Sequence, residues 1–191
     1  MSIRTVQRKL QAAGFDPGPI DGLWGRRTEA ALDAALAAAS AEKADAAREL
    51  ALERIKRWES IRLTAYPDPG TGGDPWTIGW GSTGPDVRRG TVWTQEQADA
   101  RLARDMQKFL DGVRAAVTAP AAPHEIAAMT SLAYNIGLGA FRNSTLLRMF
   151  NAGNKTGAAD QFGRWIHAGG KAMQGLINRR DDERKLFEGR G

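Results

Sequence analysis

Apolar residues at the start of the chain recur every three or four positions, which is the spacing of one helix face. The residues on this face are Ile3, Val6, Leu10 and Ala13. They predict a short helix over residues 3–13, ended by Gly14. A turn-dense segment, GFDPGPIDGLWG, follows at 14–25, and Thr28 is then a candidate N-cap for a second helix. The N-terminal segment therefore predicts a helix–loop–helix unit.

The stretch from residue 34 to residue 47 is mostly Ala with Ser, Glu, Lys and Asp. This composition favours a helix but offers little to bury, so it predicts a semi-rigid helical spacer with a candidate hinge at Ser40. Apolar periodicity returns at Leu50, Ile55 and Trp58. The predicted parts are a helical module at 1–39, a linker at 40–47 and a larger domain at 48–191.

Short alternating runs at 62–66, 76–80 and 91–93, separated by Gly and Pro, predict a small antiparallel sheet. Thr94 and Gln97 form a capping box that opens a helical region. The helices expected from there on cover 95–117, 123–136, 144–152, 156–167 and 175–188. This order predicts an α+β domain in which the small sheet lies beside a helical bundle.

The charge pattern narrows the classes of partner. The net charge is +5, but basic and acidic residues are interleaved and do not form a Lys/Arg stripe, so we expect no nucleic-acid partner. The chain has no cysteine and only two histidines, so we expect neither a metal site nor a cofactor. No apolar run suggests a secretory signal or stable membrane insertion, so we expect the protein to be held in a cytosol until another route releases it.

Two carboxylates in the segment WESIRLTAYPDPGTGGDPWTIGWGS are candidates for chemistry. Glu59 follows Trp58 at a helix end, where an apolar surface would favour the protonated acid, a state suited to proton donation. Asp68 lies in a wetter Pro/Gly turn, where its carboxylate should stay ionised. Glycoside cleavage uses such a pair. However, Glu at helix ends and Asp in turns are also ordinary structural residues.

Three further side chains lie near this pair in the sequence. Thr77 could hold a nucleophilic water, and Tyr66 and Trp80 could stack on sugar faces. The run E-x8-D followed by T-I-G-W-G resembles the catalytic motif of the phage-type lysozymes, the muramidase family of tailed-phage endolysins. SLAYNIGLGAF, STLLRMFNAG, FGRWIHAGG and GLINRRDDERKLF also resemble family segments, in the same order, so the likeness covers residues 47–188.

This resemblance implies a lysozyme-like fold and hydrolysis, with inversion, of the β-1,4 bond between N-acetylmuramic acid and N-acetylglucosamine. Glu59 matches the general acid, Asp68 the second catalytic carboxylate and Thr77 the threonine before I-G-x-G. Asn135 and Arg180 match residues that border the family's cleft, so we expect them to bind substrate.

Two departures from the family pattern affect these expectations. Eight residues separate Asp68 from Thr77, more than is common in the family, which makes Asp74 a rival for the base. The nine-residue offset from Glu59 is kept, and it favours Asp68. Ser82 stands where the family usually has a histidine, and we expect this change to affect stability more than function.

The N-terminal segment VQRKLQAAGFDPGPIDGLWGRRTEAAL resembles the small helical peptidoglycan-binding repeat of many wall hydrolases, over residues 3–38. The combination implies a monomeric endolysin that binds and cleaves peptidoglycan during host lysis. It would stay in the host cytoplasm until a holin-type pore releases it to the periplasm and cell wall. Two alternatives stay open: a lytic transglycosylase acting on the same bond, and a non-catalytic wall-binding protein.

Overall fold

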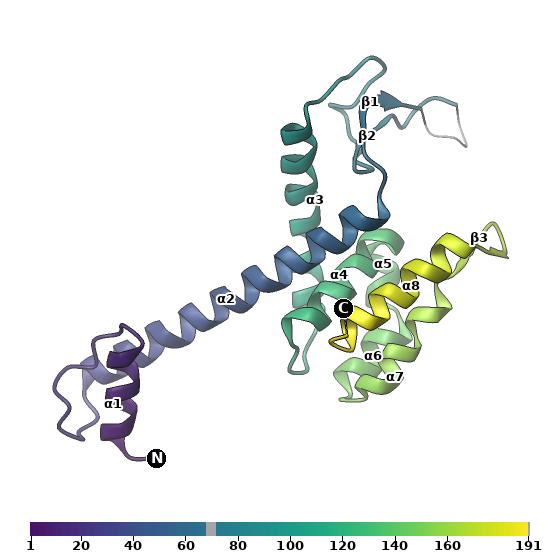
Figure 1. The fold of residues 1–191 in the computed structure, drawn as a ribbon. Helices are drawn as coiled ribbons and strands as arrows, with labels where there is room; N and C mark the ends of the chain where they lie inside the picture. Colours follow the sequence, from purple (N-terminus) through teal and green to yellow (C-terminus); the bar gives the residue numbers. More distant parts are fainter. Residues whose placement is uncertain (68–71, 191) are drawn as a thin grey trace. The chain divides into compact units, whose positions relative to one another are not determined.

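The computed structural model describes residues 1–67 and 72–190. Contacts divide the chain into two compact units, Met1–Asp45 and Ala46–Gly191. Figure 1 traces the elements of both units along the chain.

The first unit consists of α1 (Ile3–Ala12), a loop, and the start of α2 (Arg26–Trp58). Ser2 caps α1 by accepting a hydrogen bond from the backbone N–H of Thr5 at 3.3 Å. The prediction of Thr28 as an N-cap is wrong, because α2 begins two residues earlier. Thr28 is instead buried, and its hydroxyl donates to the carbonyl of Pro17 at 3.0 Å, which ties the loop to the helix.

The predicted helical spacer is part of α2, which continues through Ser40 without a break. Ser40 Oγ donates to the carbonyl of Leu36 at 2.8 Å, a bond that a mid-helix serine makes to the preceding turn. The hinge predicted at Ser40 is therefore wrong. The last turns of α2 belong to the second unit, where Ala51 and Ile55 are fully buried.

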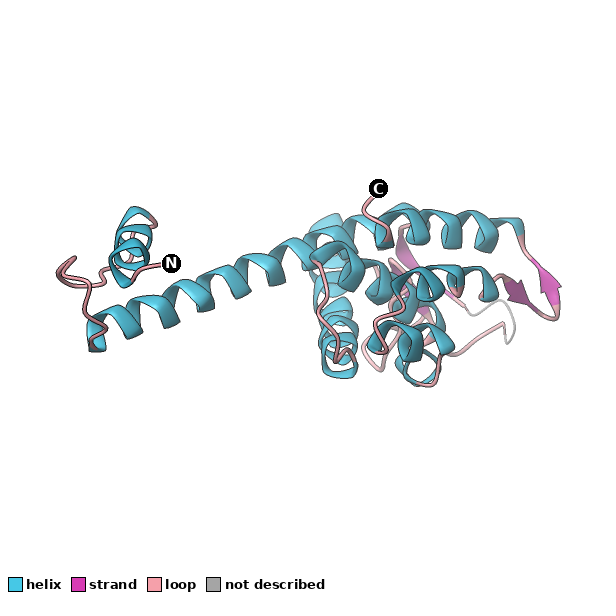
Figure 2. Ribbon diagram, turned by 90° about the horizontal axis from the view of Figure 1, so that it is seen from below, coloured by secondary structure: helices cyan, strands magenta, loops and turns pink. Residues whose placement is uncertain are grey.

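The small sheet of the second unit pairs β1 (Arg62–Tyr66) with β2 (Thr77–Gly79) in antiparallel orientation. Figure 2 colours the strands magenta among the cyan helices. The predicted bounds of the first strand are confirmed. The third predicted strand, 91–93, is reduced to a single bridge between Thr64 and Val92. A small apolar core supports the sheet, made of Ala65, Ile78 and Val87 with Trp76 and Trp93 against it.

The rest of the second unit is helical. Its helices are α3 (Gln95–Ala116), α4 (Pro123–Ile136), α5 (Leu138–Arg142), α6 (Thr145–Asn151), α7 (Lys155–Asp160) and α8 (Gln174–Phe187), with a 3₁₀ turn at Phe162–Arg164. The Thr94–Gln97 capping box is confirmed at the start of α3, and Pro123 is the first residue of α4. Helix α4 is the most buried of them, so the main core forms around it.

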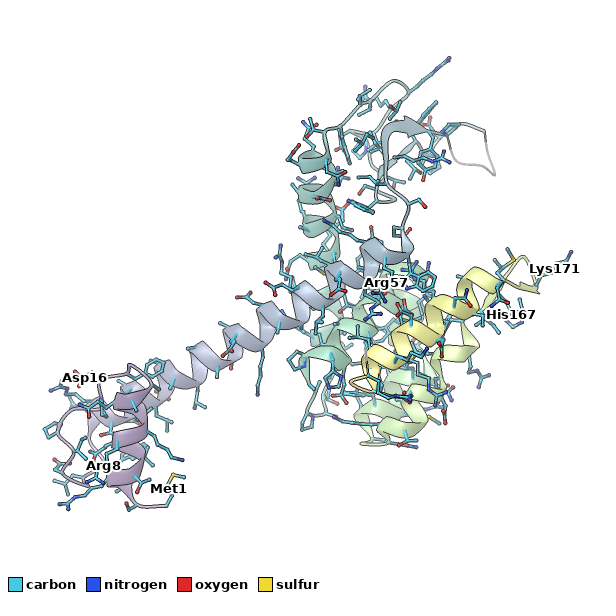
Figure 3. All side chains as sticks on the ribbon, viewed as in Figure 1. Met1, Arg8, Asp16, Arg57, His167 and Lys171 are labelled. Carbon is cyan, nitrogen blue, oxygen red and sulfur yellow. The ribbon has the colours of Figure 1, made fainter. Side chains whose placement is uncertain are left out.

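A two-stranded hairpin was not predicted. It pairs β3 (His167–Ala168) with β4 (Lys171–Ala172), in a segment where we expected a helix end and an irregular stretch. Gly169 and Gly170 have φ of 56° and 76°, and positive φ at both central positions is what a type I′ hairpin turn requires. The strands are exposed, and Figure 3 labels His167 and Lys171 on them. No buried face existed to leave an alternating pattern in the sequence.

Candidate active site

Glu59 follows the last residue of α2, and the helix before it fixes the position of its backbone. Its backbone N–H donates to the carbonyl of Ile55 at 3.0 Å, which continues the helical bonding by one residue. Ile55 is fully buried in the main core. The helix end that carries Glu59 is therefore anchored by apolar packing.

The Glu59 side chain forms an ion pair with Arg179 of α8. Arg179 Nη1 donates to Glu59 Oε1 at 2.8 Å. The side chain of Arg179 is 5% exposed, whereas that of Glu59 is 24% exposed. The expectation of an apolar surface around this carboxyl is therefore wrong, because a buried guanidinium lies against one of its oxygens.

The other oxygen of Glu59 faces the loop after β2. A Cβ placed on Gly81 would lie 3.8 Å from Glu59 Oε2, and among the described residues no hydrogen bond to Oε2 is present. Gly81 has φ of 90°, which a residue with a side chain rarely adopts. One oxygen is thus held by Arg179, while the other lies near a glycine and accepts no hydrogen bond from the described residues.

A buried polar cluster holds Arg179 on the side away from Glu59. Glu183, fully buried, accepts from Arg179 Nε at 3.1 Å, from Arg180 Nη2 at 2.9 Å and from Ser131 Oγ at 2.7 Å, all through Oε1. Burial raises the pKa of Glu183, and the two arginines oppose that rise. Arg179 Nη2 is buried with no hydrogen-bond partner among the described residues. The cluster holds Arg179 rigidly where it meets Glu59.

Arg180 does not have the position expected of a substrate-binding residue. Its side chain is 1% exposed and lies against Glu183, so it is inaccessible in this structure. Arg180 Nη1 donates to Asn135 Oδ1 at 3.2 Å, and Asn135 itself is exposed. The expectation for Arg180 is therefore corrected: its neighbour Arg179 reaches the site. A helical period alone could not show which arginine of the pair faces α2.

Tyr66 and Thr77 face each other as an antiparallel pair between β1 and β2. Both are half-buried. The guanidinium of Arg62 lies over the Tyr66 ring at 4.5 Å from its centroid, so one ring face is already covered. The sheet therefore brings these two predicted residues together, and a sugar contact by Tyr66 would use its remaining surface.

Trp80 makes contacts within the protein. Its indole N–H donates to Asp99 Oδ1 at 2.7 Å, and Lys56 Nζ lies 5.5 Å from its ring centroid. Lys56 also pairs with Asp99 at 3.0 Å, and Tyr134 OH donates to the Trp80 carbonyl at 3.3 Å. These contacts connect β2 to α2, α3 and α4. Trp80 stacking on a sugar stays a prediction, and in this structure the residue joins the sheet to the helices.

Tyr134 also lies within electrostatic range of the candidate acid. Burial raises the pKa of the Tyr134 phenol above its ordinary value, and the charge of Glu59 adds to the rise. Tyr134 is therefore a neutral hydrogen-bond donor at the site, a role that the sequence did not indicate.

The structure describes only one of the two candidate bases. Asp68 lies outside the described residues. Asp74 is exposed and precedes Pro75 at the entrance to β2. The choice of Asp68 over Asp74 stays a prediction.

The family model for phage lysozyme matches residues 56–183. The chain belongs to the phage lysozyme family. A model for a peptidoglycan-binding domain matches residues 2–35. The lysozyme match contains Glu59, Arg179 and Glu183, while the second match covers α1, its loop and the start of α2.

Individual relatives agree with this assignment. The endolysin of Bacillus phage PZA is 44% identical over 133 residues, covering 70% of this chain and 51% of the phage protein, so the chain spans about half of that relative's length. The endolysin of Acyrthosiphon pisum secondary endosymbiont phage 1 is 39% identical over 144 residues, covering 73% of this chain and 96% of its own. The solved endolysin of Escherichia coli O157:H7 phage FAHEc1 superposes with a TM-score of 0.66 at 36% identity, covering 72% and 90% of the two chains.

The serine in place of the usual family histidine has a buried polar partner. Ser82 is 3% exposed, and its Oγ donates to Asp105 Oδ2 at 3.1 Å. Arg101 Nε donates to the same oxygen at 2.8 Å, and Arg101 Nη2 donates to the carbonyl of Thr83 at 2.8 Å. In this lysozyme chain a serine and an arginine together satisfy the carboxylate. These residues line a pocket of about 310 Å³ with Gly81 and Tyr134.

The peptidoglycan-binding unit has its own pocket, about 420 Å³ in volume, in the D-G-L-W-G turn. Gln7, 1% exposed, organises the turn: its amide nitrogen donates to Asp21 Oδ1 at 3.1 Å and to the carbonyl of Leu23 at 3.0 Å. Its oxygen accepts from the N–H of Gly22 at 3.0 Å. Trp24, which lines the pocket, is 48% exposed. A buried glutamine thus fixes a loop that presents an indole to solvent.

Within 1–67 and 72–190, no helix is both long and apolar enough to cross a membrane. Over the same residues, no group of three or more His, Asp or Glu side chains could hold a metal ion.

Proposed function

We propose that the chain is a modular endolysin that hydrolyses the β-1,4 bond between N-acetylmuramic acid and N-acetylglucosamine in bacterial peptidoglycan, with inversion. The observation that carries the proposal is the geometry of Glu59 in a phage lysozyme family chain. One oxygen accepts from a buried guanidinium at 2.8 Å, and the other lies near Gly81 with no hydrogen bond from the part of the chain that the structure describes. A fixed carboxyl with one free oxygen suits proton transfer to a glycosidic oxygen.

In this proposal Glu59 protonates the leaving oxygen, and a second carboxylate activates the water that attacks the anomeric carbon. Asp68 takes the second role, with Asp74 as its rival, and Thr77 on β2 helps to hold the water. Arg179 stabilises the Glu59 carboxylate once its proton has left. Inversion requires room for a water between the two carboxyl groups, which are then about 6.5–9.5 Å apart.

The N-terminal unit would keep the enzyme on its polymer. Binding through the Trp24 loop converts each cleavage event into an intramolecular encounter, which raises the effective substrate concentration. Aromatic rings present large, rigid surfaces at low entropic cost, so an indole is a suitable contact for a sugar face.

Product analysis tests the reaction. Purified peptidoglycan is digested with the enzyme. Mass spectrometry then gives the masses of the products, and NMR follows the anomeric configuration of the new reducing ends. Hydrolysis with inversion gives reducing ends of full mass that appear first as the α anomer. Anhydro products, lighter by one water, would instead show a transglycosylase, and intact walls would show a binding protein.

Glu59→Gln is measured beside the wild type, with Glu53→Gln as its matched control. Glu53 lies on the same helix and is exposed. We expect Glu59→Gln to keep its fold and lose at least about a hundredfold in rate, and Glu53→Gln to keep full activity. Full activity of Glu59→Gln would rule out Glu59 as the acid.

The cellular setting stays a prediction. Host lysis, residence in the host cytoplasm and release through a holin-type pore are tested together by expressing the chain with and without such a pore and following culture turbidity. Lysis without the pore would contradict the predicted route. The predicted monomer is tested by light scattering after size exclusion.

A further inference from the structure

Asp182 of α8 accepts hydrogen bonds from three side chains near the C-terminal end of α2. Its Oδ2 accepts from the indole N–H of Trp58 at 2.7 Å, and its Oδ1 accepts from Arg57 Nη1 at 3.1 Å. Arg54 Nη1 also pairs with Oδ1. Figure 3 labels Arg57 on this turn, beside α8.

The contacts of Asp182 with Arg54 and Trp58 are largely shielded from water, whereas Arg57 is exposed. The side chains of Arg54 and Asp182 are 5% and 17% exposed. Burial works to raise the pKa of Asp182, but hydrogen bonds from Arg54 and Trp58 and the charges of Arg54 and Arg57 outweigh it, so the pKa lies below its ordinary value. A carboxylate that stays charged and bonded to three side chains makes a rigid attachment between the two helices.

This attachment lies next to the candidate acid in both helices. Trp58 immediately precedes Glu59, and Asp182 lies three residues after Arg179, so both α8 residues lie on one helix face. The same turn of α2 is held on another side by Lys56, which pairs with Asp99 of α3. The end of α2 is thus fixed from two helices, and the contact on α8 is adjacent to the Glu59–Arg179 pair.

We propose that Asp182 is a positioning residue for Glu59: by holding Trp58 and Arg54, it sets where the Glu59 carboxyl lies relative to Arg179 and Gly81. The inference rests on the proposed function, because it assigns Asp182 a role in the reaction that Glu59 performs. Asp182 itself touches neither Glu59 nor the open side of the site in the contacts described above.

The consequence for catalysis follows from the precision that proton transfer needs. A displacement of about 1 Å at a reacting group can lower a rate about a hundredfold. If Trp58 loses its acceptor, the last turn of α2 can rotate or shift while Ile55 remains packed in the core. Glu59 would then keep its chemistry but lose its alignment with Arg179.

Two substitutions isolate this effect, and a third controls for it. Asp182→Asn keeps the side-chain shape but removes the charge, and Trp58→Phe removes only the indole N–H with most of the ring kept. Asp181→Asn removes the same charge from the neighbouring residue, which is 59% exposed and pairs with Lys185. Each purified full-length variant is assayed for kcat and KM on soluble glycan fragments of peptidoglycan, across pH 4 to 9 at a temperature where circular dichroism shows it folded.

We expect kcat to fall about ten- to a hundredfold in Asp182→Asn and about tenfold in Trp58→Phe, with KM changed less than about threefold. The alkaline limb of the kcat profile, where the proton donor is lost, should move in both, because Glu59 has changed its distance to Arg179 and Tyr134. The double variant should be no slower than Asp182→Asn alone, since both substitutions break one contact. Asp181→Asn should match the wild type.

A purely structural role predicts something else. At a temperature where each variant is fully folded, a purely structural role leaves kcat and the position of the pH profile at the wild-type values, and that result would overturn the proposal. If Asp182→Asn does not fold, Trp58→Phe decides alone by the same criteria. Glu59→Gln separates the two levels. Full activity of Glu59→Gln would rule out the proposed role of Glu59. If Glu59→Gln is inactive while Asp182→Asn and Trp58→Phe have wild-type activity, only the positioning role of Asp182 is ruled out.

Discussion

Arg179 bonds two carboxylates at once: Nη1 donates to Glu59 Oε1 at 2.8 Å and Nε donates to Glu183 Oε1 at 3.1 Å. Glu183 is fully buried, whereas Glu59 is partly open to solvent. One guanidinium therefore connects the interior of the helical bundle to the candidate acid. This arrangement makes stability and activity depend on the same side chain.

Replacing Arg179 should affect both properties. Arg179→Met leaves the fully buried Glu183 with one cation fewer, so we expect the free energy of unfolding to fall by about 3 kcal/mol, at the low end for a broken buried pair because Arg180 and Ser131 remain. The activity should fall with it, since Glu59 loses its partner. Urea denaturation and the rate of wall clearing measure the two effects.

Arg184→Met is the matched control for this substitution. Arg184 lies on the same helix and pairs with Asp160 where both side chains are largely exposed. Its loss should change stability by at most about 1 kcal/mol and leave activity unchanged. Equal losses in the two variants would contradict the special position of Arg179.

The glycine beside Glu59 supplies a second test. Gly81→Ala places a methyl 3.8 Å from Glu59 Oε2 and forces a side chain into φ of 90°. We expect a stability loss of about 1–2 kcal/mol from the backbone and, in addition, a fall in kcat/KM of about tenfold, because the methyl occupies the open side of the acid. Thermal unfolding and initial rates report the two effects separately.

Gly90→Ala carries the same backbone penalty without that neighbour. Gly90 has φ of 84°, and a Cβ there would meet nothing within 4 Å. Its stability loss should resemble that of Gly81→Ala while its kcat/KM stays at the wild-type value. A Gly81→Ala enzyme with full activity would show that the open oxygen of Glu59 is not where substrate approaches.

Local sequence patterns predicted those elements whose determinants are local. The capping box at Thr94, Pro123 at a helix start and the alternation that gives β1 each depend on residues within a few positions of one another. The N-cap prediction for Thr28 was wrong because the partner of its hydroxyl is not local. The hydroxyl donates to the carbonyl of Pro17 and does not cap its own helix. The exposed hairpin at 167–172 left no apolar pattern to detect.

The candidate site depended on contacts that a linear pattern does not contain. Glu59 was predicted from its motif, but its partner Arg179 is 120 residues away. Arg180 was selected from the same dipeptide, and only the packing of α8 shows that it points inward to Glu183. Likewise, a tryptophan such as Trp80 is a residue type that often stacks on sugars. Its hydrogen bond to Asp99 is a tertiary contact, which the sequence does not reveal.

The N-terminal unit should be separable from catalysis in the full chain. Trp24→Ala removes the exposed indole from the pocket, so we expect binding to purified walls to weaken about tenfold, which corresponds to about 1.4 kcal/mol. The kcat on soluble glycan fragments should not change. Leu36→Ala, at another exposed apolar residue of this unit, should leave wall binding intact. Co-sedimentation with walls measures the affinity, and equal binding by wild type and Trp24→Ala would exclude this pocket.

The stability contributed by Asp182 should be present at neutral pH and disappear at acid pH. Its pKa is lowered in the folded protein despite burial, by hydrogen bonds from Arg54 and Trp58 and by nearby positive charge. A carboxyl with a depressed folded pKa stabilises the fold above its unfolded pKa of about 4, and this contribution is lost as the pH falls through the folded value. The free energy of unfolding of Asp182→Asn should therefore lie below that of the wild type at pH 7 and approach it towards pH 2, whereas Asp181→Asn should follow the wild type closely. Chemical denaturation across this range measures the difference, and a gap of constant size would mean that the loss comes from shape and not from the charge of Asp182.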